Sequence, residues 1–308
     1  MSDERFLCIC ADDFGLSEGI NAAALELANS GKLSAIGCMV RRKFWPTGSR
    51  ELRQLDADHV DIGLHLDLDF PSAPGGREGS LVSLIALGYL GLLKGSRLRD
   101  EIRLQLSSFE DRMGRAPAFV DGHRHIHQLP GVRDLLVAEL TTRYRDALPW
   151  LRNTSPPEPR RLPRTKTELK ARVIHALGGS ELKRLADRHG IPMSRSLLGV
   201  YTFPANDVDY ERDFSRWFLQ CGNGDVLMCH PSLGEREMTA TGVPPAPHDA
   251  SRRREYLALK EIDLAALHET AGIVVAPLSR AFSSKAMNSS TPVDLTDSMR
   301  GAPEELRW

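Results

Sequence analysis

The sequence predicts an α/β protein built on a mainly parallel sheet. Apolar, β-rich runs alternate with longer helical patterns along nearly all of its 308 residues. No linker, repeat or change in composition divides the chain, and a single barrel of βα units can reach this length. We therefore expect one barrel-like domain over residues 1–284 and a polar, weakly ordered tail over residues 285–308.

The expected strands are short apolar runs that give a sheet of about seven strands. They are residues 6–10, 34–40, 60–68, 118–121, 150–152, 196–201, 225–229 and 273–276. Helical spacing of apolar residues, with capping residues at several ends, predicts helices at 17–31, 97–113, 132–146, 166–189 (broken at Gly178-Gly179), 210–220 and 251–270. Residues 155–195 interrupt this rhythm, so we expect an insertion there that shapes the substrate site.

Charge and cysteine content exclude several classes of function. The chain has 40 Lys and Arg against 41 Asp and Glu, so no basic field favours nucleic acid, and a neutral substrate fits better. Acidic residues occupy the N-terminus where a signal peptide needs basic ones, which predicts a cytoplasmic protein. The five cysteines form no CxxC pair and lie in apolar runs, as expected of reduced core residues.

The longest apolar stretch is LVSLIALGYLGLL, residues 81–93. It falls well short of the roughly 20 residues that a membrane-spanning helix needs, so we expect no transmembrane segment. Such a stretch is more often a buried core helix, although an exposed flap over a site is the alternative.

Polar residues that suit metal binding or acid–base chemistry recur where predicted strands end. In a parallel barrel, all the carboxyl ends of the strands open on one face, so these side chains would converge in one pocket. They are Asp12 and Asp13, His65, His123, Arg152 and His230.

Asp12 and Asp13 are adjacent, so they cannot both point the same way; one could bind a metal while the other faces a reacting water. Taken alone, the pair could also cap or turn the chain before the helix at Ser17. His123, His125 and His127 would share one face if the strand continued through them. Gly122 suggests a turn instead, which would leave only one or two of the histidines near a common metal.

A set of two histidines and one carboxylate leaves coordination positions open, as a catalytic metal site requires. A divalent ion there would lower the pKa of a bound water and polarise a carbonyl oxygen, which suits hydrolysis of an amide. His230, in CHPS, could supply the proton that a leaving amine needs, although a buried structural histidine is the alternative.

Five motifs resemble the YdjC-like carbohydrate deacetylases, the family of chitooligosaccharide deacetylase and the hopanoid-biosynthesis deacetylase. The motifs are ADDFGLSEGIN (11–21), GLHLDL (63–68), DGHRHIHQLPGV (121–132), GVYTF (199–203) and MCHPS (228–232). They occur in the family's order, and the resemblance covers residues 5–280. The family's histidine run commonly lacks an arginine, whereas Arg124 interrupts it here, between the ligand positions.

The resemblance implies a NodB-like deformed (β/α) barrel, one divalent metal and removal of an acetyl group from an N-acetylated amino sugar. By motif, Asp13, His65 and His123 would be the metal ligands and Asp12 the general base. His230 would be the acid, and Arg152 a contact to the substrate or to Asp12. The family favours Mg²⁺, whereas nitrogen ligands favour Zn²⁺ or another late transition metal such as Co²⁺.

Two other functions remain open on the sequence. The same metal set could hydrolyse another amide or a phosphate ester, although no Gly-rich anion cradle is present. The second alternative is a non-catalytic sugar-binding barrel, which would be expected to lack the general base or one of the metal ligands. The substrate would be an N-acetylglucosamine-containing oligosaccharide or glycolipid, with the apolar 81–93 segment favouring an amphiphilic one. We also expect a homodimer, which is common in such enzymes.

Overall fold

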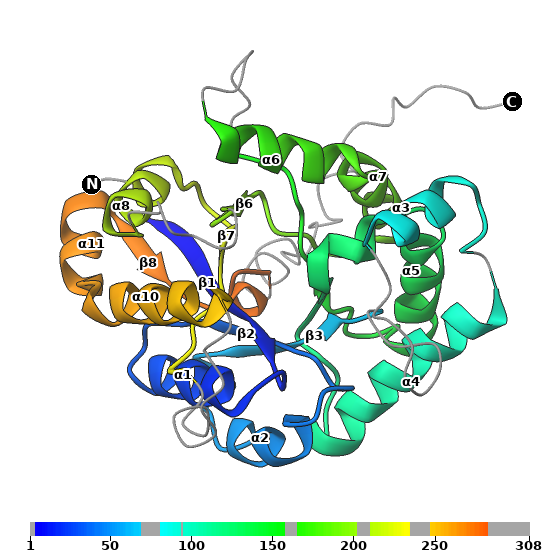
Figure 1. The fold of residues 1–308 in the computed structure, drawn as a ribbon, viewed down its shortest axis with the longest axis horizontal. Helices are drawn as coiled ribbons and strands as arrows, with labels where there is room; N and C mark the ends of the chain where they lie inside the picture. Colours follow the sequence, from blue (N-terminus) through cyan, green and yellow to red (C-terminus); the bar gives the residue numbers. More distant parts are fainter. Residues whose placement is uncertain are drawn as a thin grey trace, which may run out of the picture.

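A computed structural model describes residues 4–68, 81–93, 95–157, 165–201, 210–234 and 247–282, and the predicted tail at 285–308 lies outside them. The described strands form one parallel sheet in the order β5, β4, β3, β2, β1, β7, β6, with β8 against the start of β1. Helices ring the curled sheet (Figure 1). The predicted α/β class with a mainly parallel sheet is confirmed.

The strands follow the predicted runs closely. They are β1 Arg5–Phe14, β2 Ala35–Cys38, β3 Asp61–Leu66, β4 Phe119–Gly122, β5 Trp150–Leu151, β6 Leu197–Leu198, β7 Asp225–Cys229 and β8 Ile273–Val275. One difference matters for the site: β1 runs four residues beyond the predicted end, so Asp12 and Asp13 lie within the strand and not after it.

The helices are α1 Glu18–Asn29, α2 Trp45–Leu52, α3 Leu81–Tyr89, α4 Ser96–Met113, α5 Val132–Arg143, α6 Lys166–Ala176, α7 Gly179–His189, α8 Tyr210–Gln220, α10 Pro247–Glu261 and α11 Leu264–Ala271. The stretch 251–270, predicted as one helix, is divided between α10 and α11. Asp263 caps α11 by accepting a hydrogen bond from the Ala266 amide at 3.0 Å, which starts a new helix there.

Side-chain alternation along β1 separates two apolar layers. Leu7, Ile9 and Ala11 belong to the core between sheet and helices. Cys8 and Cys10 face the other way, into the barrel interior, where they pack with residues such as Phe119 and Trp150. Because side chains alternate with a period of two, Asp12 is directed to the same interior.

The floor of the barrel interior is closed by aromatic packing. The rings of Phe119 and Trp150 stack with centroids 4.5 Å apart. Gly63 makes room for them, since a Cβ at this position would lie 2.4 Å from a Phe119 ring atom. Asp12 and His65 lie toward the carboxyl ends of their strands, whereas the buried Asp61, at the start of β3, accepts a hydrogen bond from Trp150 Nε1.

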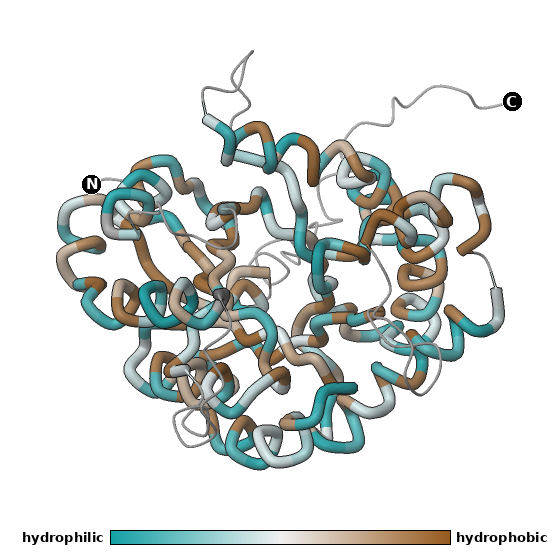
Figure 2. The backbone as a smooth tube through the Cα atoms, viewed as in Figure 1, coloured by the Kyte–Doolittle hydropathy of each residue, from teal (hydrophilic) through white to brown (hydrophobic). Residues whose placement is uncertain are grey.

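Helix α3 differs from the interpretation favoured on the sequence. Gly88 is its one buried residue, whereas Val82 and Tyr89 are exposed. The core-helix interpretation of residues 81–93 is therefore wrong, and Figure 2 shows this apolar segment on the outside of the molecule.

Candidate active site

Asp13 owes its position to an irregularity near the end of β1. Its φ of 70° is left-handed, a conformation that Asp tolerates better than most residues, and the register with β2 shifts between Ala11 and Phe14. Strict alternation would turn Asp13 away from the interior. The local turn instead brings it to the cavity beside Asp12.

His65 reaches the same place from β3. Ile62, Leu64 and Leu66 pack in the outer core, so His65 faces the interior between them. Its Nδ1 lies 2.7 Å from Asp121 Oδ1, and its Nε2 lies 3.5 Å from Asp13 Oδ1. A carboxylate on one ring nitrogen orients the imidazole and leaves the other nitrogen directed at Asp13.

His123 comes from the turn that follows β4. Gly122 ends the strand, and Arg124 and His125 then adopt left-handed φ values of 53° and 60°. His123 Nδ1 consequently lies 3.1 Å from Asp13 Oδ1. The turn separates the three histidines, as Gly122 suggested: His125 lines the cavity, and His127 Nε2 is 3.0 Å from the Arg152 carbonyl oxygen.

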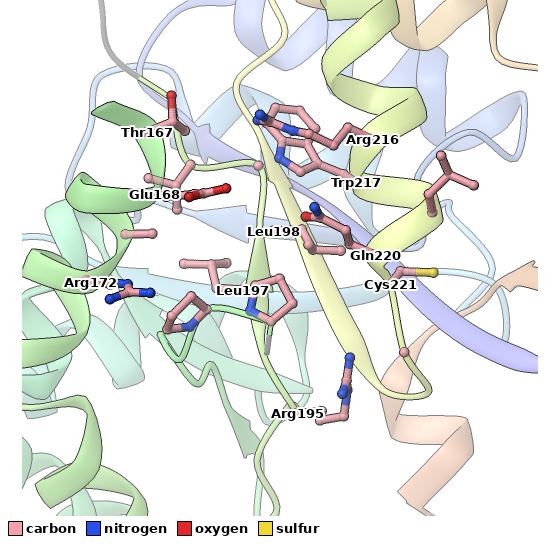
Figure 3. A pocket seen from close by; sticks show the side chains of 17 residues that line it. Thr167, Glu168, Arg172, Arg195, Leu197, Leu198, Arg216, Trp217, Gln220 and Cys221 are labelled. Atoms are coloured by element: carbon pink, nitrogen blue, oxygen red, sulfur yellow. The ribbon is translucent and has the colours of Figure 1, made fainter. Parts of the chain in front are cut away.

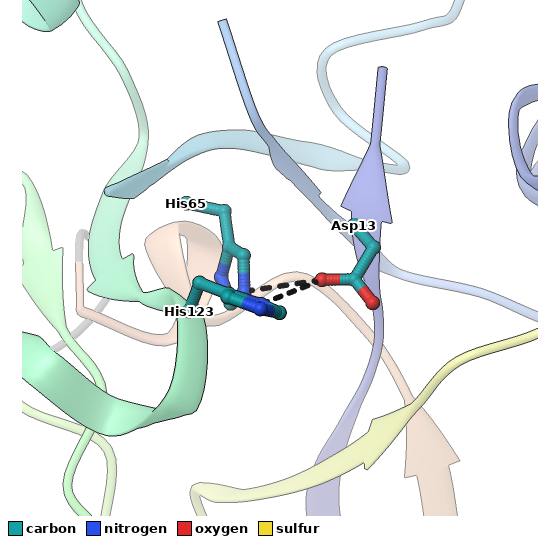
Figure 4. A group of neighbouring side chains, drawn as sticks. All are labelled: Asp13, His65 and His123. Atoms are coloured by element: carbon teal, nitrogen blue, oxygen red, sulfur yellow. Dashed lines mark hydrogen bonds and ion pairs between the residues drawn. The ribbon is translucent and has the colours of Figure 1, made fainter. Parts of the chain in front are cut away.

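Asp13, His65 and His123 form a cluster that could hold a metal ion, since one donor atom from each lies within 4.8 Å of the others (Figure 4). A second such group, Asp12, His65 and Asp121, shares His65. Two imidazole nitrogens and a carboxylate oxygen are donors that Zn²⁺ and other late divalent ions accept. The donor set thus fits the predicted metal.

Arg152 links the carboxylates beneath this cluster. Its guanidinium donates to both oxygens of Asp12, at 2.6 and 2.7 Å, and its Nη2 is 2.6 Å from Asp121 Oδ2. All three side chains are buried. Of the two contacts predicted for Arg152, the one to Asp12 is present.

The buried charges shift the titration of their neighbours. Burial alone would lower the pKa of His65, but Asp121 and Asp12 outweigh it and raise the pKa to about 9. Burial would raise the pKa of Asp121, yet Arg152 and His65 bring it down to about 2. Asp121 therefore stays ionised and can anchor the imidazole at any ordinary pH.

His230 follows β7 and reaches the cavity opposite the histidine pair. Its backbone N–H donates to Glu255 Oε2 at 2.8 Å, and its Nδ1 lies 3.3 Å from the Tyr201 hydroxyl. That hydroxyl in turn donates to Glu255 Oε2 at 2.5 Å. Burial lowers the pKa of His230 to about 4, so its imidazole is neutral near pH 7 until a negative charge develops beside it.

Helix α10 supplies two groups that sequence reasoning missed. Arg252 forms an ion pair with Asp13 Oδ2, which leaves Oδ1 directed at the two histidines. Glu255, one turn later, contacts His230 and Tyr201. In the sequence both lie in the charged run SRRREY, where nothing distinguishes them from a solvated helix face. The sequence did indicate Asp121, because this residue lies at the end of a predicted strand, two residues before His123.

The cavity above these residues has a volume of about 510 Å³. Five of the six predicted side chains line it: Asp12, Asp13, His65, His123 and His230. Aliphatic residues such as Leu16, Met39 and Ile174 form much of the remaining wall, and Arg124 and Lys170 add positive charge. The walls are therefore largely aliphatic, with charged side chains of both signs among them.

A second cavity of about 450 Å³ lies between α6 and α8, across β6 (Figure 3). Arg172, Arg195 and Trp217 are among its lining residues, and Arg195 is held by both carboxylate oxygens of Asp225. Neither metal-binding group found in the described ranges lies in it.

Comparison with known proteins agrees with this geometry. Residues 6–270 match the family model described as "YdjC-like protein". A "Chitooligosaccharide deacetylase" of Enterobacter sp. (strain 638) is 30% identical over 146 residues, which cover 46% of this chain and 57% of that protein. A "Carbohydrate deacetylase" of Mus musculus is 29% identical over 140 residues, covering 41% of this chain and 44% of that protein. The chain thus spans about half the length of the curated relatives it matches.

Among solved structures, a "putative cellobiose-phosphate cleavage protein" from Enterococcus faecalis V583 superimposes with a TM-score of 0.64. It is 18% identical, and the match covers 91% of this chain and 99% of that one. At this identity the likeness concerns the fold alone. Because the family model covers most of its length, the chain belongs to the YdjC-like protein family.

Proposed function

We propose that this protein is a metal-dependent deacetylase that removes the acetyl group from an N-acetylated amino sugar, in an oligosaccharide or a glycolipid. The observation that carries the proposal is the cluster of Asp13, His65 and His123 in the cavity, with Asp12 and His230 on its walls. The names of the relatives, which are deacetylases of carbohydrates, support the choice of substrate.

In this proposal Asp13, His65 and His123 hold one divalent ion, Mg²⁺, Zn²⁺ or Co²⁺. When bound, the ion lowers the pKa of a water molecule and polarises the acetyl carbonyl. Asp121 and Arg252 act on the ligands from behind: the first orients His65, and the second fixes the carboxylate of Asp13.

Asp12 is the proposed base, which takes a proton from the water as its oxygen attacks the acetyl carbon. Arg152 holds the Asp12 carboxylate in place through both of its oxygens and balances its charge inside the barrel. The carbon–nitrogen bond then breaks, and the amine nitrogen takes a proton from His230, which has first taken up that proton from solvent. The proton that Asp12 took returns to solvent when the products leave. Negative charge that develops on the substrate during the attack favours the protonated form of His230, whose Nδ1 is positioned by Tyr201.

The proposal is tested by acetate release from a panel of N-acetylglucosamine oligomers and glycolipids, with the protein loaded with Mg²⁺, Zn²⁺ or Co²⁺. We expect release that falls by about 10² to 10⁴ in Asp12→Asn, as is typical for loss of a general base. The variant must still bind the metal at the wild-type stoichiometry, which separates loss of the base from loss of the site. A metal-loaded wild-type protein that releases acetate from none of these substrates would rule the proposal out.

A further inference from the structure

Exposed apolar side chains are concentrated on the two helices beside the cavity. In the described part of the chain, ten large apolar residues are exposed, and three of them, Leu104, Leu219 and Leu257, lie singly on other helices. The other seven lie on α3, the residues that follow it, and α6. They are Val82, Leu87, Tyr89, Leu90, Leu92, Leu169 and Val173, exposed by 39% to 74%, and we refer to them as the apolar rim.

The same helices face the cavity with their other sides. Leu81 and Ile85, one turn apart on α3, line the cavity. Ile174 and Leu177, from the end of α6 and just beyond it, line the cavity as well. The apolar rim is therefore continuous with the aliphatic cavity wall that leads down to Asp13. An apolar surface of this extent on a folded protein marks an interaction site.

The charges around the apolar rim are mostly positive. Residues 81–93 carry no charge, and the start of α4 shortly after them carries Arg97 and Arg99 together with Asp100 and Glu101. Residues 165–177 contain Lys166, Lys170 and Arg172 against one Glu168. These segments thus carry an excess of positive charge in a chain whose formal charge is −1. Apolar side chains next to basic ones, with an amphipathic tyrosine, suit the interface of a membrane with anionic headgroups.

We propose that the apolar rim binds the surface of a lipid bilayer that carries anionic headgroups, and so places the cavity mouth against membrane-borne N-acetylated sugars. Only the identity of the membrane-borne substrate rests on the proposed function; the contact with the bilayer does not. The contact is peripheral, because no described helix has the length and apolar character to cross a bilayer. A second copy of the chain is the alternative occupant of the rim, and the oligomeric state in solution distinguishes it from a bilayer.

The test is co-sedimentation of the full chain with phosphatidylcholine vesicles, with and without phosphatidylglycerol. We expect binding to the anionic vesicles that weakens as salt is added. The double substitution Val82→Ser with Leu90→Ser should lower the partition coefficient by about tenfold or more, since each change withdraws apolar area from the lipid. The matched control is Leu219→Ser with Leu257→Ser, which removes two exposed leucines from α8 and α10 and should bind as wild type does.

Three outcomes would overturn the inference: no binding to anionic vesicles, equal losses in the rim and control variants, or a dimer in solution that the rim variant alone dissociates. Vesicle binding is measured without turnover, so its failure leaves the proposed deacetylation untouched. Vesicle binding without acetate release from any substrate would instead support membrane binding by the apolar rim and contradict the proposed function. Acetate release from a short water-soluble N-acetylated sugar should be the same in the rim variant and the wild type.

Discussion

Arg152 carries a positive charge in the interior of the barrel, against the carboxylates of Asp12 and Asp121. Moving a guanidinium out of water costs several kcal/mol, and only well-placed partners offset it. Here both carboxylates are equally buried, so each charge depends on the others. Removal of Arg152 would leave the carboxylate of Asp12 without this partner in a medium of low polarity.

Arg152→Met should therefore lower the free energy of unfolding at pH 7 by about 3–5 kcal/mol, as measured by urea denaturation. Arg184→Met is the control, because Arg184 pairs with Glu181 at 2.6 Å and both side chains are exposed. Its loss should cost about 1 kcal/mol or less. Equal losses in the two variants would contradict this account.

Glu255 should make the free energy of unfolding depend on pH, and the sign of this dependence follows from the pKa of its carboxyl group. Burial raises the pKa of Glu255 to about 7 from an ordinary value of 4.5. A carboxyl with a raised pKa in the folded state contributes stability below pH 4.5, and this contribution is lost as the pH rises through about 7. The shift corresponds to about 3 kcal/mol.

Glu255→Gln mimics the protonated form at every pH. The wild-type free energy of unfolding, measured relative to this variant, should therefore fall by about 3 kcal/mol between pH 4.5 and pH 8. Glu26→Gln provides a comparison of opposite sign, because hydrogen bonds from Lys260 and Tyr256 lower the pKa of the exposed Glu26. A difference between the wild type and Glu255→Gln that does not change with pH would show that Glu255 is not buried as described.

The sequence predicted which side chains lie together where their position at a strand end determines it, and their roles stay predictions. The carboxyl ends of parallel strands meet, so Asp12, His65 and His230 could be grouped before any contact was known. Arg252 and Glu255 could not be predicted this way, because the contacts of a charged helix residue depend on how the helix packs against the rest of the protein. The same limit applies to the left-handed backbone at Asp13, which depends on the bulge against β2.

At the scale of elements, the turn η1, His123–Gln128, fixes which histidine enters the metal cluster. Gly122 precedes it with an extended φ of −155°, so the backbone itself suits any residue. A Cβ at Gly122, however, would lie 2.9 Å from both the His127 amide nitrogen and Ile126 Cγ1. The turn folds so tightly on the strand end that a side chain is excluded.

Gly122→Ala should displace this turn, lower the free energy of unfolding by about 1–3 kcal/mol and weaken Zn²⁺ binding through His123. Denaturation and titration calorimetry measure the two effects. Gly95→Ala is the control, since Gly95 is also extended and nothing lies within 4 Å of its added Cβ. The explanation fails if the alanine at 122 is tolerated as well as the alanine at 95.

Element prediction was accurate for strands and less so for two helices. Buried strands have a local apolar signal, which β1 and β7 display in full. Helix α2 was not predicted, because its sequence WPTGSREL contains poor helix formers and is stabilised by packing instead. Residues 81–93 are apolar without being buried, so composition alone indicated the wrong environment for α3.

At the scale of the whole molecule, metal binding should stabilise the fold, since the three proposed ligands come from β1, β3 and the turn after β4. A ligand that binds only the folded state at about 1,000 times its Kd adds about 4 kcal/mol. Zn²⁺ should therefore raise the Tm by several degrees in a thermal-shift measurement. Asp13→Asn should abolish the rise, whereas the exposed His59→Ala should retain it. A rise that persists in Asp13→Asn would place the metal elsewhere.

Strand β1 pairs with β2 directly after it in the chain, and also with β7 and β8, whose residues Asp225 and Val275 both lie opposite Leu7. During translation β1 leaves the ribosome before β7 and β8, so it lacks these two partners until residues 225–275 have been made. His230, Arg252 and Glu255 emerge with the same residues. We therefore expect nascent chains to depend on a holding chaperone that covers the open edge of β1, and to acquire a complete site only once α10 has been made.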